Sequence, residues 1–325
     1  MRAAYAAAID SEHPLNGLTV GTIDEPGPPA EGWVRVEVRA SSLNHHDLWS
    51  LRGVGLAPSQ LPMVLGCDAA GIGPDGAEVI VHAVIGDPAA GPDETYDPKR
   101  TLLSERYPGT FADAVWVPAR NLVPKPATLS FAEAACLPTA WLTAYKMLVY
   151  KGQVKEGNAV LVQGAGGGVA TAAVVLAQAL GARVYATSRS AAKRERVAAL
   201  GATAVEPGAR LPERVDVVIE TVGAPTIDHS LKSTAPGGRI ISSGATGGHQ
   251  AEIDLRRVFF LQIDLLGATM GSREQLTEIA ELMADRGITP VIDSVYPFDR
   301  AAEAFARLES GEAFGKIVLD HTASA

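Results

Sequence analysis

The sequence predicts an α/β protein built from two parts of different character. Before about residue 125, short alternating apolar and polar runs lie between clusters of proline and glycine, which is typical of a small β-rich unit. From residue 158 onward, short apolar runs alternate with helical stretches, and the first run leads through a glycine-rich turn into a helix. Continuous apolar runs suit strands covered on both faces, so the second part is predicted to be a doubly wound parallel sheet.

In the β-rich part, GWVRVEVRAS (32–41) and AEVIVHAVI (77–85) are predicted strands. The first residues also predict a strand rather than a signal peptide, because Asp10 and further polar residues follow the short apolar run at once. Near the end, FDRAAEAFARLESG (298–311) predicts a helix, and FGKIVLD (314–320) predicts a strand that returns to the first part. The predicted domains are 1–124 with 289–325, and 125–288.

The second part is predicted to begin with a helix and to continue with five strands. SFAEAACLPTAWLTAYKMLV (130–149) is predicted to be helical, and Ser130 with Glu133 three residues later forms a capping-box pattern at its start. Two further predicted helices end at Gly181 and Gly201. The apolar runs expected to form strands are NAVLVQG (158–164), ARVYATS (182–188), VDVVIETVG (215–223), GGRIISSGA (237–245) and QIDLLGATM (262–270).

Charge and cysteine content argue against several classes of protein. The net charge of −9 argues against a broad basic face for nucleic acid. The two cysteines, Cys67 and Cys136, are too few for a disulfide framework or a four-cysteine zinc site, and they fit a reducing compartment. No apolar run reaches the roughly 18 residues that a membrane span requires. We therefore expect a cytoplasmic protein that binds neither nucleic acid nor membrane.

The glycine-rich turn in VLVQGAGGGVATAA (160–173) is the strongest chemical signal in the sequence. Glycines between a strand and a helix let backbone N–H groups approach a pyrophosphate, and the positive end of the helix faces the negative charge. The strict G-x-G-x-x-G spacing is not met, but the βαβ context still predicts a dinucleotide site. The residues expected to line the phosphates are Gly164, Ala165, Gly166, Gly167, Gly168 and Val169.

The end of the next predicted strand favours NADPH over NADH. Folds that bind NAD usually place an acidic residue there, which holds the 2′-hydroxyl of the ribose. In this chain no acid occurs between that strand end and Glu195. A hydroxyl and cations suit a 2′-phosphate, and cations near a helix start oppose the helix dipole, so their presence favours a bound anion. The expected contacts to the 2′-phosphate of NADPH are Ser188, Arg189 and Lys193.

Five motifs occur in an order that resembles one known family. The chain carries, in this order, LNHHDLW, LGCDAAG, LPTAWLTAY, VLVQGAGGGVA and FGKIVL. Together they resemble the medium-chain dehydrogenase/reductase superfamily, and the resemblance covers nearly the whole chain. It implies a GroES-like catalytic domain interrupted by a Rossmann domain, with the cofactor held between the two.

The resemblance also locates the positions where zinc members of the superfamily bind their catalytic metal. Those positions are occupied here by Asn44, Cys67 and Thr139. Only the cysteine is a good zinc ligand. His45, His46 and Asp68 are not expected to replace the missing ligands, because side chains of consecutive extended residues point to opposite faces. The segment 86–108, where many relatives bind a structural zinc, has no cysteine. We therefore expect no metal, as in the zinc-free quinone oxidoreductases and enoyl reductases.

The same resemblance implies roles for the residues of the LNHHDLW motif. Asn44 is expected near the nicotinamide, in contact with it or with a substrate carbonyl. His46 or His45 is expected to donate a proton or to contact a cofactor phosphate, and the two histidines remain alternatives. Asp47 belongs to this candidate catalytic group and is expected to anchor the loop.

Further candidate residues lie in a substrate pocket and at strand ends. Trp49 stands where some enoyl reductases have a tyrosine proton donor, so its expected role is an apolar pocket wall, shared with Leu56, Met63 and Trp141. In open α/β sheets, ligands bind at the carboxyl ends of the strands. The remaining expected cofactor contacts are Thr139, Val222, Gly223, Ser243, Gly244, Met270 and Gly271.

These observations predict a zinc-independent, NADPH-dependent oxidoreductase. Its substrate is expected to be a small apolar carbonyl compound with an activated alkene, such as an enone or enoyl compound, or a quinone. Two alternatives remain open: an alcohol or aldehyde dehydrogenase with a nonstandard metal site, and a non-catalytic NADPH-binding protein. From the resemblance alone, we also expect a homodimer formed through the Rossmann sheet edge near 259–270.

Overall fold

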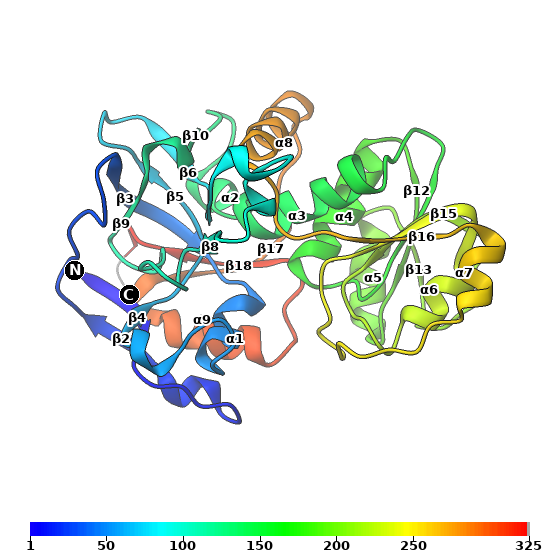
Figure 1. Cartoon of the computed structure of the whole chain (residues 1–325), viewed down its shortest axis with the longest axis horizontal. Helices are drawn as coiled ribbons and strands as arrows, with labels where there is room; N and C mark the ends of the chain where they lie inside the picture. The colour runs from blue at the N-terminus through cyan, green and yellow to red at the C-terminus, as the bar shows by residue number, and fades with distance from the viewer. Residues whose placement is uncertain (324–325) are drawn as a thin grey trace. The chain divides into compact units, whose positions relative to one another are not determined.

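The computed structural model describes residues 1–323 and divides the chain into two compact units (Figure 1). The first unit consists of Met1–Leu142 and the chain from Met270 onward, and the second unit is Thr143–Thr269. These boundaries differ from the predicted ones, because residues 125–142 and 270–288 group with the first unit.

The first unit is organised around a mostly antiparallel sheet that includes both early and late segments of the chain. Its strands are β3 (Trp33–Ser42), β5 (Asp68–Ile72), β6 (Glu78–Val81), β9 (Ala114–Pro118), β10 (Leu122–Pro124), β17 (Ile292–Pro297) and β18 (Lys316–Asp320). Their order is β10-β6-β5-β3-β18-β17, and β9 also pairs with β3. The final strand β18 runs antiparallel to β3, with Val318 opposite Ser42. The prediction that the tail returns to the first part is therefore confirmed.

Two small sheets and several helices complete the first unit. Phe111 and Phe305 meet edge to face, with ring centroids 5.8 Å apart, inside an apolar core cluster. The small sheets contain β1 (Arg2–Ala6), β2 (Leu18–Thr22) and β4 (Met63–Val64), and β7 (Val84–Ile85) with β8 (Thr101–Leu102). The helices are α1 (His45–Leu51), α2 (Phe131–Ala134), α8 (Arg273–Arg286) and α9 (Ala301–Glu309).

The second unit contains a parallel sheet of six strands. The strands are β11 (Ala159–Val162), β12 (Arg183–Thr187), β13 (Thr203–Val205), β14 (Val215–Glu220), β15 (Thr234–Ser242) and β16 (Asp264–Gly267). Their order is β13-β12-β11-β14-β15-β16. This order, in which the chain starts in the middle and proceeds first to one edge and then to the other, is that of a Rossmann sheet. The predicted doubly wound sheet is thus confirmed.

Helices connect the strands of the second unit, and a helical segment leads into it. The helices are α4 (Gly168–Ala179), α5 (Ala191–Ala199), α6 (Ile227–Ser233) and α7 (Leu255–Leu261), and the short α3 (Leu142–Tyr145) leads in from the first unit. At the start of α2, Ser130 Oγ accepts from the backbone N–H of Glu133 at 3.2 Å, and Glu133 Oε2 accepts from the backbone N–H of Ser130 at 2.8 Å. The predicted capping box is present. Within residues 1–323, no helix is long and apolar enough to cross a membrane.

The LNHHDLW motif differs from its expected conformation. Residues His45–Leu51 form helix α1, so the argument that His45 and His46 lie on opposite faces of an extended segment is wrong. In a helix, neighbouring side chains are separated by about 100° around the axis. The helix begins after Asn44, whose backbone N–H donates to Asp47 Oδ2 at 2.7 Å. This local hydrogen bond is the physical reason for the turn into a helix.

Candidate active site

In the first unit, a buried polar cluster surrounds the carboxylate of Asp68, the first residue of β5. Oδ2 accepts from the hydroxyl of Ser42 at 2.9 Å, the amide of Asn44 at 2.8 Å and the ammonium of Lys316 at 3.0 Å. Oδ1 accepts from the hydroxyl of Thr139 at 2.5 Å. Four donors and one positive charge therefore offset the loss of hydration around this buried carboxylate.

Lys316, at the start of β18, carries the positive charge of this cluster and is 2% exposed. Its Nζ donates to Leu43 O at 2.8 Å, to Asn44 Oδ1 at 2.7 Å and to Asp68 Oδ2 at 3.0 Å. An ammonium has three N–H groups, so these partners use all of them. The pairing of β18 with β3 supports this arrangement, because Leu43 N–H also donates to Ile317 O at 2.9 Å.

The side-chain amide of Asn44 is held at both ends by this cluster. Its Oδ1 accepts from Lys316, and its Nδ2 donates to Asp68. Asn44 is 9% exposed, so little of its surface is open to a ligand. The structure therefore gives Asn44 a place in the cage around the ammonium, and its direct contact with nicotinamide or substrate stays a prediction.

Asp47 is fully buried in helix α1, where its carboxylate holds the helix start. Burial raises the pKa of Asp47 to about 7. The hydrogen bond from Asn44 N–H and the charge of Lys316 lower this pKa, whereas the charge of Asp68 raises it. This arrangement fits the expected loop anchor and gives helix α1 a carboxyl group whose pKa is raised to about 7.

The two adjacent histidines have different surroundings. His45 is exposed, whereas His46 is half-buried. Burial lowers the pKa of His46, although the charges of Glu105 and Asp68 oppose this shift. The Nε2 atom of His46 is buried and has no hydrogen-bond partner among residues 1–323. A buried nitrogen of this kind suits a hydrogen bond to a ligand, so His46 is the better-placed candidate of the two.

The residues at the expected zinc positions do not fit a zinc ion. Asn44 and Thr139 are both hydrogen-bonded to Asp68, and the Cys67 thiol donates to Leu103 O at 3.2 Å. Burial raises the pKa of Cys67 well above its ordinary value, which opposes the thiolate form that binds zinc. Among residues 1–323, no three His, Cys, Asp or Glu side chains form a group that could hold a metal.

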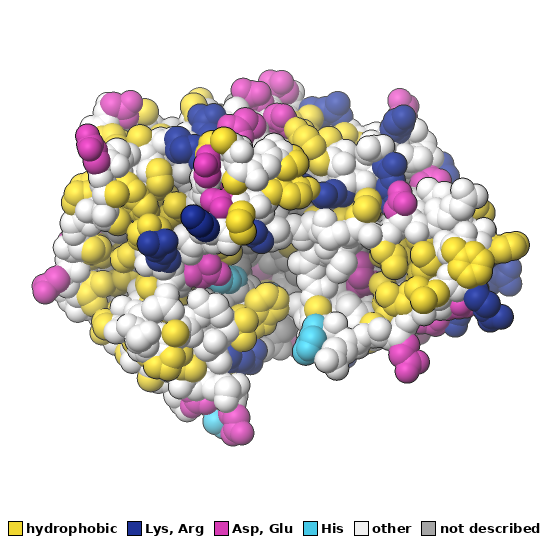
Figure 2. All heavy atoms as spheres, in the orientation of Figure 1, with side chains coloured by type: hydrophobic (Ala, Val, Ile, Leu, Met, Phe, Trp, Pro, Cys, Tyr) yellow, Lys and Arg dark blue, Asp and Glu magenta, His cyan; other side chains and the backbone are white. Residues whose placement is uncertain are grey.

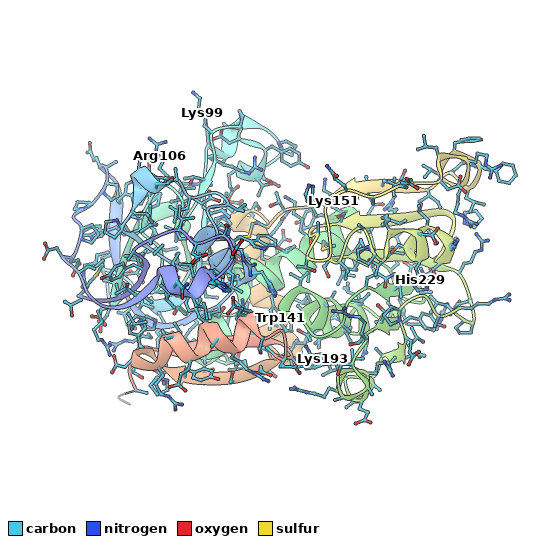
Figure 3. The ribbon with its side chains drawn as sticks, turned by 90° about the horizontal axis from the view of Figure 1, so that it is seen from below. Lys99, Arg106, Trp141, Lys151, Lys193 and His229 are labelled. Atoms are coloured by element: carbon cyan, nitrogen blue, oxygen red, sulfur yellow. The ribbon has the colours of Figure 1, made fainter. Side chains whose placement is uncertain are left out.

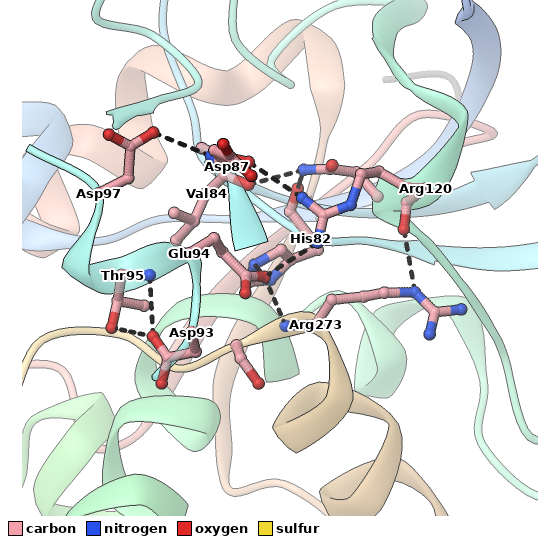
Figure 4. Close-up of polar contacts among 12 residues, drawn as sticks. His82, Val84, Asp87, Asp93, Glu94, Thr95, Asp97, Arg120 and Arg273 are labelled. Atoms are coloured by element: carbon pink, nitrogen blue, oxygen red, sulfur yellow. Dashed lines mark hydrogen bonds and ion pairs between the residues drawn. The ribbon is translucent and has the colours of Figure 1, made fainter. Parts of the chain in front are cut away.

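The cysteine-free segment 86–108 is attached to the rest of the first unit by a buried contact between a histidine and a carboxyl group (Figure 4). His82 Nε2 lies 3.0 Å from Glu94 Oε1, and both side chains are fully buried. The same Glu94 oxygen accepts from the backbone N–H of Arg273 at 2.8 Å, in the first turn of α8. In addition, Asp87 N–H donates to Asp97 Oδ2 at 2.9 Å within the segment. Contacts between protein groups, without cysteine, therefore hold the segment that corresponds to the expected structural-zinc position.

In the second unit, the glycine-rich turn has the shape of a phosphate cradle. Gly164 and Gly166 have φ angles of +74° and +136°, which side chains rarely allow. A Cβ atom on Gly164 would lie 2.5 Å from Val222 Cγ2, whereas one on Gly167 would meet nothing within 4 Å. Gly167 precedes helix α4, so backbone N–H groups at its start are available to an anion. The predicted phosphate-binding residues from Gly164 to Val169 all lie in this turn or in the first turn of α4.

The residues expected at the 2′-phosphate lie at the end of β12 and the start of α5. Ser188 is 6% exposed, and Arg189 is exposed without an ion-pair partner within the described part of the chain. The side chain of Lys193, which Figure 3 labels, lies close to the glycine-rich turn, because a Cβ atom on Gly166 would lie 2.8 Å from Lys193 Cδ. Arg194 instead pairs with Glu206 at 3.0 Å.

The remaining predicted cofactor residues fall into two groups. Val222 and Gly223 follow β14, and Ser243 and Gly244 follow β15, so all four lie at carboxyl ends of adjacent strands. The hydroxyl of Ser243 is buried without a hydrogen-bond partner among residues 1–323, which suits a ligand contact. By contrast, the structure groups Thr139, Met270 and Gly271 with the first unit.

The four predicted pocket residues differ in exposure. Leu56 and Met63 belong to an apolar core cluster and are 3% and 6% exposed. Trp141 is fully buried, and its Nε1 has no hydrogen-bond partner within the described residues. Trp49, on helix α1, is half-buried and therefore keeps surface for a substrate. Roles in a substrate pocket remain predictions for all four.

Two buried acceptors organise these sites without a predicted role of this kind. From the sequence, Asp68 is only a possible replacement metal ligand, and Glu220, at the end of β14, has no predicted role. Each is a charged residue beside an apolar run, in LGCDAAG and VDVVIETVG. A buried charge needs hydrogen-bond or ionic partners, so a charged residue beside an apolar run is the sequence signal that could have identified Asp68 and Glu220.

Comparisons with known proteins agree with this architecture. A family model described as an alcohol dehydrogenase GroES-like domain matches residues 30–127, and one described as a zinc-binding dehydrogenase matches residues 193–319. Acryloyl-coenzyme A reductase of Metallosphaera sedula is 30% identical over 323 residues, which cover 93% of this chain and 96% of that protein.

Solved structures show the same likeness. An NAD-dependent alcohol dehydrogenase is 35% identical, with a TM-score of 0.89, over 98% of this chain and 99% of that chain. The 2-octenoyl-CoA carboxylase reductase CinF, solved with NADP and 2-octenoyl-CoA, is 25% identical, with a TM-score of 0.89, over 98% of this chain and 87% of that chain. With its GroES-like first unit and its Rossmann second unit, the chain belongs to the medium-chain dehydrogenase/reductase superfamily.

Proposed function

We propose that this oxidoreductase uses NADPH, without zinc, to reduce an activated alkene such as that of an enoyl thioester or an enone. The observation that carries the proposal is the cluster around Lys316 and Asp68: two of the three residues at the expected zinc positions, Asn44 and Thr139, are hydrogen-bonded within it, Asn44 to both charged groups and Thr139 to Asp68. The similarity to acryloyl-coenzyme A reductase over nearly the full length supports the choice of an enoyl substrate.

The preference for NADPH rests on the end of β12. Ser188 and the exposed guanidinium of Arg189 stand where an NAD-binding fold usually has an acid. The complex of CinF with NADP supports the same cofactor. The similarity to an NAD-dependent alcohol dehydrogenase is the specific observation that favours NADH, and the binding experiment below distinguishes the two.

When bound, NADPH supplies the hydride for the β-carbon of the alkene. The chain must then stabilise negative charge on the substrate carbonyl oxygen and deliver a proton. His46 offers a buried Nε2 that has no hydrogen-bond partner within the described residues, and this nitrogen can donate a hydrogen bond to an oxyanion when it carries a proton. The final proton comes from His46, His45 or water, and these remain alternatives.

The activity test is a panel of substrates with purified protein. We expect NADPH oxidation with 2-enoyl thioesters and enones, and no NADP⁺ reduction with simple alcohols. One tightly bound zinc per chain, together with alcohol oxidation, would instead favour an alcohol dehydrogenase. Tight NADPH binding without turnover of any enal, enone or quinone would favour a non-catalytic NADPH-binding protein. Turnover of quinones alone would shift the substrate class to quinones.

The cofactor test compares two exposed arginines of the second unit. We expect Arg189→Ala to weaken NADPH binding about tenfold, since a charge-assisted contact to phosphate contributes roughly 1–3 kcal/mol, and to leave NADH binding unchanged. Arg256→Ala, which removes an arginine on helix α7 whose side chain is 88% exposed, is the matched control. Equal affinity of the wild type for NADH and NADPH would refute the NADPH assignment.

A further inference from the structure

The second unit contains a buried side-chain network that starts at Gln163, the residue after β11. Its Oε1 accepts a hydrogen bond from Thr187 Oγ1 at 2.7 Å. Its Nε2 lies 3.0 Å from Ser230 Oγ and 2.9 Å from His229 Nδ1. Thr187 Oγ1 in turn accepts from the backbone N–H of Gly164 at 3.1 Å. Gln163 is thus linked by side chains to the first glycine of the predicted phosphate cradle.

The orientation of the Gln163 amide follows from its neighbours. His229 Nε2 lies 2.9 Å from Ala209 O, and because a carbonyl oxygen only accepts, Nε2 carries the proton and Nδ1 is left as an acceptor. Nδ1 therefore accepts from Gln163 Nε2, which fixes Oε1 on the side of Thr187. A half-turn of the amide would place its oxygen against the Nδ1 lone pair.

At its other end the network reaches Glu220, the fully buried last residue of β14. Glu220 Oε2 accepts from Ser230 Oγ at 2.7 Å. Glu220 Oε1 accepts from the backbone N–H groups of Val222 and Gly223, both at 2.9 Å. Thr226 Oγ1 adds a third donor to the same oxygen at 2.8 Å. The carboxylate therefore shapes the turn that follows β14.

The network joins the carboxyl ends of three adjacent strands, since the sheet order is β12-β11-β14. Ligands of open parallel sheets bind at these ends. The glycine-rich turn and the turn after β14 are also in contact, because a Cβ atom on Gly164 would lie 2.5 Å from Val222 Cγ2. The buried hydrogen bonds therefore connect the two turns in addition to the backbone pairing of β11 with β14.

We propose that Gln163 is a positioning residue for NADPH: through Thr187 on one side, and through Ser230 and Glu220 on the other, it sets the separation of the two turns that hold the dinucleotide. The proposal rests on the proposed function, because it assigns the network to NADPH binding. Gln163 has no exposed surface, so it acts through its partners and does not touch the cofactor.

An apolar replacement of similar length tests this role, since it removes the hydrogen bonds without opening a large cavity. Gln163→Met leaves Thr187, Ser230 and His229 each without one partner. The two turns then populate additional arrangements, and NADPH must select the competent one, which lowers its apparent affinity. The chemical step, which depends on groups of the first unit, keeps its rate.

The experiment measures NADPH dissociation constants by fluorescence, with kcat, KM and the melting temperature of each variant. We expect Gln163→Met and Thr187→Val each to weaken NADPH binding about tenfold and to raise KM for NADPH with kcat unchanged within about twofold. Thr187→Ser, which keeps the hydroxyl, should bind like the wild type. The double variant should be little weaker than either single variant, because both break one chain of hydrogen bonds.

The matched control is Gln178→Met, the same change near the carboxyl-terminal end of helix α4. The positioning role would be overturned if Gln163→Met has a lower melting temperature but an NADPH dissociation constant within twofold of the wild-type value. If Gln163→Met fails to fold, the comparison of Thr187→Val with Thr187→Ser decides the question alone. A wild type that does not bind NADPH at all would overturn the proposed function instead.

Discussion

Lys316 and Asp68 are separated by 248 residues in the sequence, yet Nζ and Oδ2 lie 3.0 Å apart with almost no exposure to solvent. A buried pair of this kind contributes little net stability, because both ions lose their hydration. Removing one partner is costly, since the other charge then remains buried alone. The pair therefore fixes the arrangement of Asn44 and Thr139 more than it stabilises the fold.

The first prediction concerns the Lys316 ammonium. Lys316→Met should lower the free energy of unfolding by about 3–5 kcal/mol, because Asp68 is left as an uncompensated buried charge. Adding Asp68→Asn should restore part of this loss. Lys232→Met, at an exposed ion pair with Asp228, is the control and should change stability by less than about 1 kcal/mol. Equal effects of the two single substitutions in urea unfolding would contradict the prediction.

A second residue-scale prediction follows from the raised pKa of Asp47. The unfolded carboxyl loses its proton near pH 3.8, whereas the folded one keeps it to about 7, so folding binds a proton between these values and stability falls as pH rises. Asp47→Asn does not titrate. From pH 4 to pH 8, the wild type should therefore lose about 1–4 kcal/mol relative to this variant, at about 1.4 kcal/mol per pKa unit.

Paired urea unfolding curves at several pH values test the Asp47 prediction, because all other titrating groups are shared by the two proteins. A stability difference that stays constant between pH 4 and pH 8 would show that Asp47 keeps an ordinary pKa. The stability difference should change between about pH 4 and pH 7 and level off above about pH 7.

At the scale of elements, local patterns predicted the strands and most helices. The alternation in 32–41 corresponds to β3, and the capping box of Ser130 and Glu133 starts α2. Helix α1 was missed, although Asn44 followed three residues later by Asp47 is itself a helix-start pattern. With seven residues, α1 is too short for its periodicity to stand out against a strand or a turn.

The element-scale prediction concerns the junction of the 86–108 segment with α8. Glu94 Oε1 accepts from the N–H of Arg273, one of the helix-start groups that have no partner within the helix. Burial alone would raise the pKa of Glu94, but the contacts with His82 and Arg273 lower it to about 2. Glu94→Gln should lower the free energy of unfolding at pH 7 by about 1–3 kcal/mol.

The pH dependence of the Glu94 effect has a defined sign. The folded pKa is depressed from 4.5 to about 2, so the carboxylate stabilises the fold above pH 4.5 and loses this effect as pH falls toward 2. Wild type and Glu94→Gln should therefore converge in stability as the pH falls from about 4.5 toward 2. Glu12→Gln, on an exposed loop, should match the wild type throughout. A Glu94→Gln effect that is the same at pH 3 and pH 7 would contradict the lowered pKa of Glu94.

At the scale of the whole molecule, the second unit exposes apolar side chains on α7 and β16, the edge strand of its sheet (Figure 2). Phe259 and Phe260 are 69% and 79% exposed, and Leu255, on α7, and Leu265, on β16, are 69% and 40% exposed. Exposed apolar patches beside an unpaired strand edge favour self-association. This observation favours the expected homodimer, which stays a prediction.

The dimer prediction is tested by sedimentation or light scattering. Phe259→Glu with Phe260→Glu should convert a wild-type dimer to a monomer, because four buried charges in the symmetric interface are strongly unfavourable. Val54→Glu, at a side chain of the first unit that is 60% exposed, is the control and should leave the dimer intact. A wild type that is monomeric at micromolar concentration would end the proposal.

The boundaries between the two units differ from the predicted ones because of the way helices α2 and α8 pack. Near residue 124, short β-rich runs give way to helix, and the sequence marks this change. Helix α2 nevertheless packs on β3 and β5, and α8 packs on β10, so both remain with the first unit. The unit that a helix joins depends on which element covers its apolar face. The periodicity of the sequence shows that the helix has an apolar face, but it does not show which element packs against that face.

By itself, the sequence determined the α/β class, the glycine-rich turn, the order of the superfamily motifs and the residue types at the expected metal positions. These features are local, because backbone periodicity, capping and turn chemistry act over a few residues. Only the tertiary structure showed that Asp68 faces Lys316, that His82 faces Glu94 and that Gln163 connects to Glu220 through Ser230. Buried polar groups must find partners, but the fold brings those partners from distant parts of the chain, so their identity is absent from any local pattern.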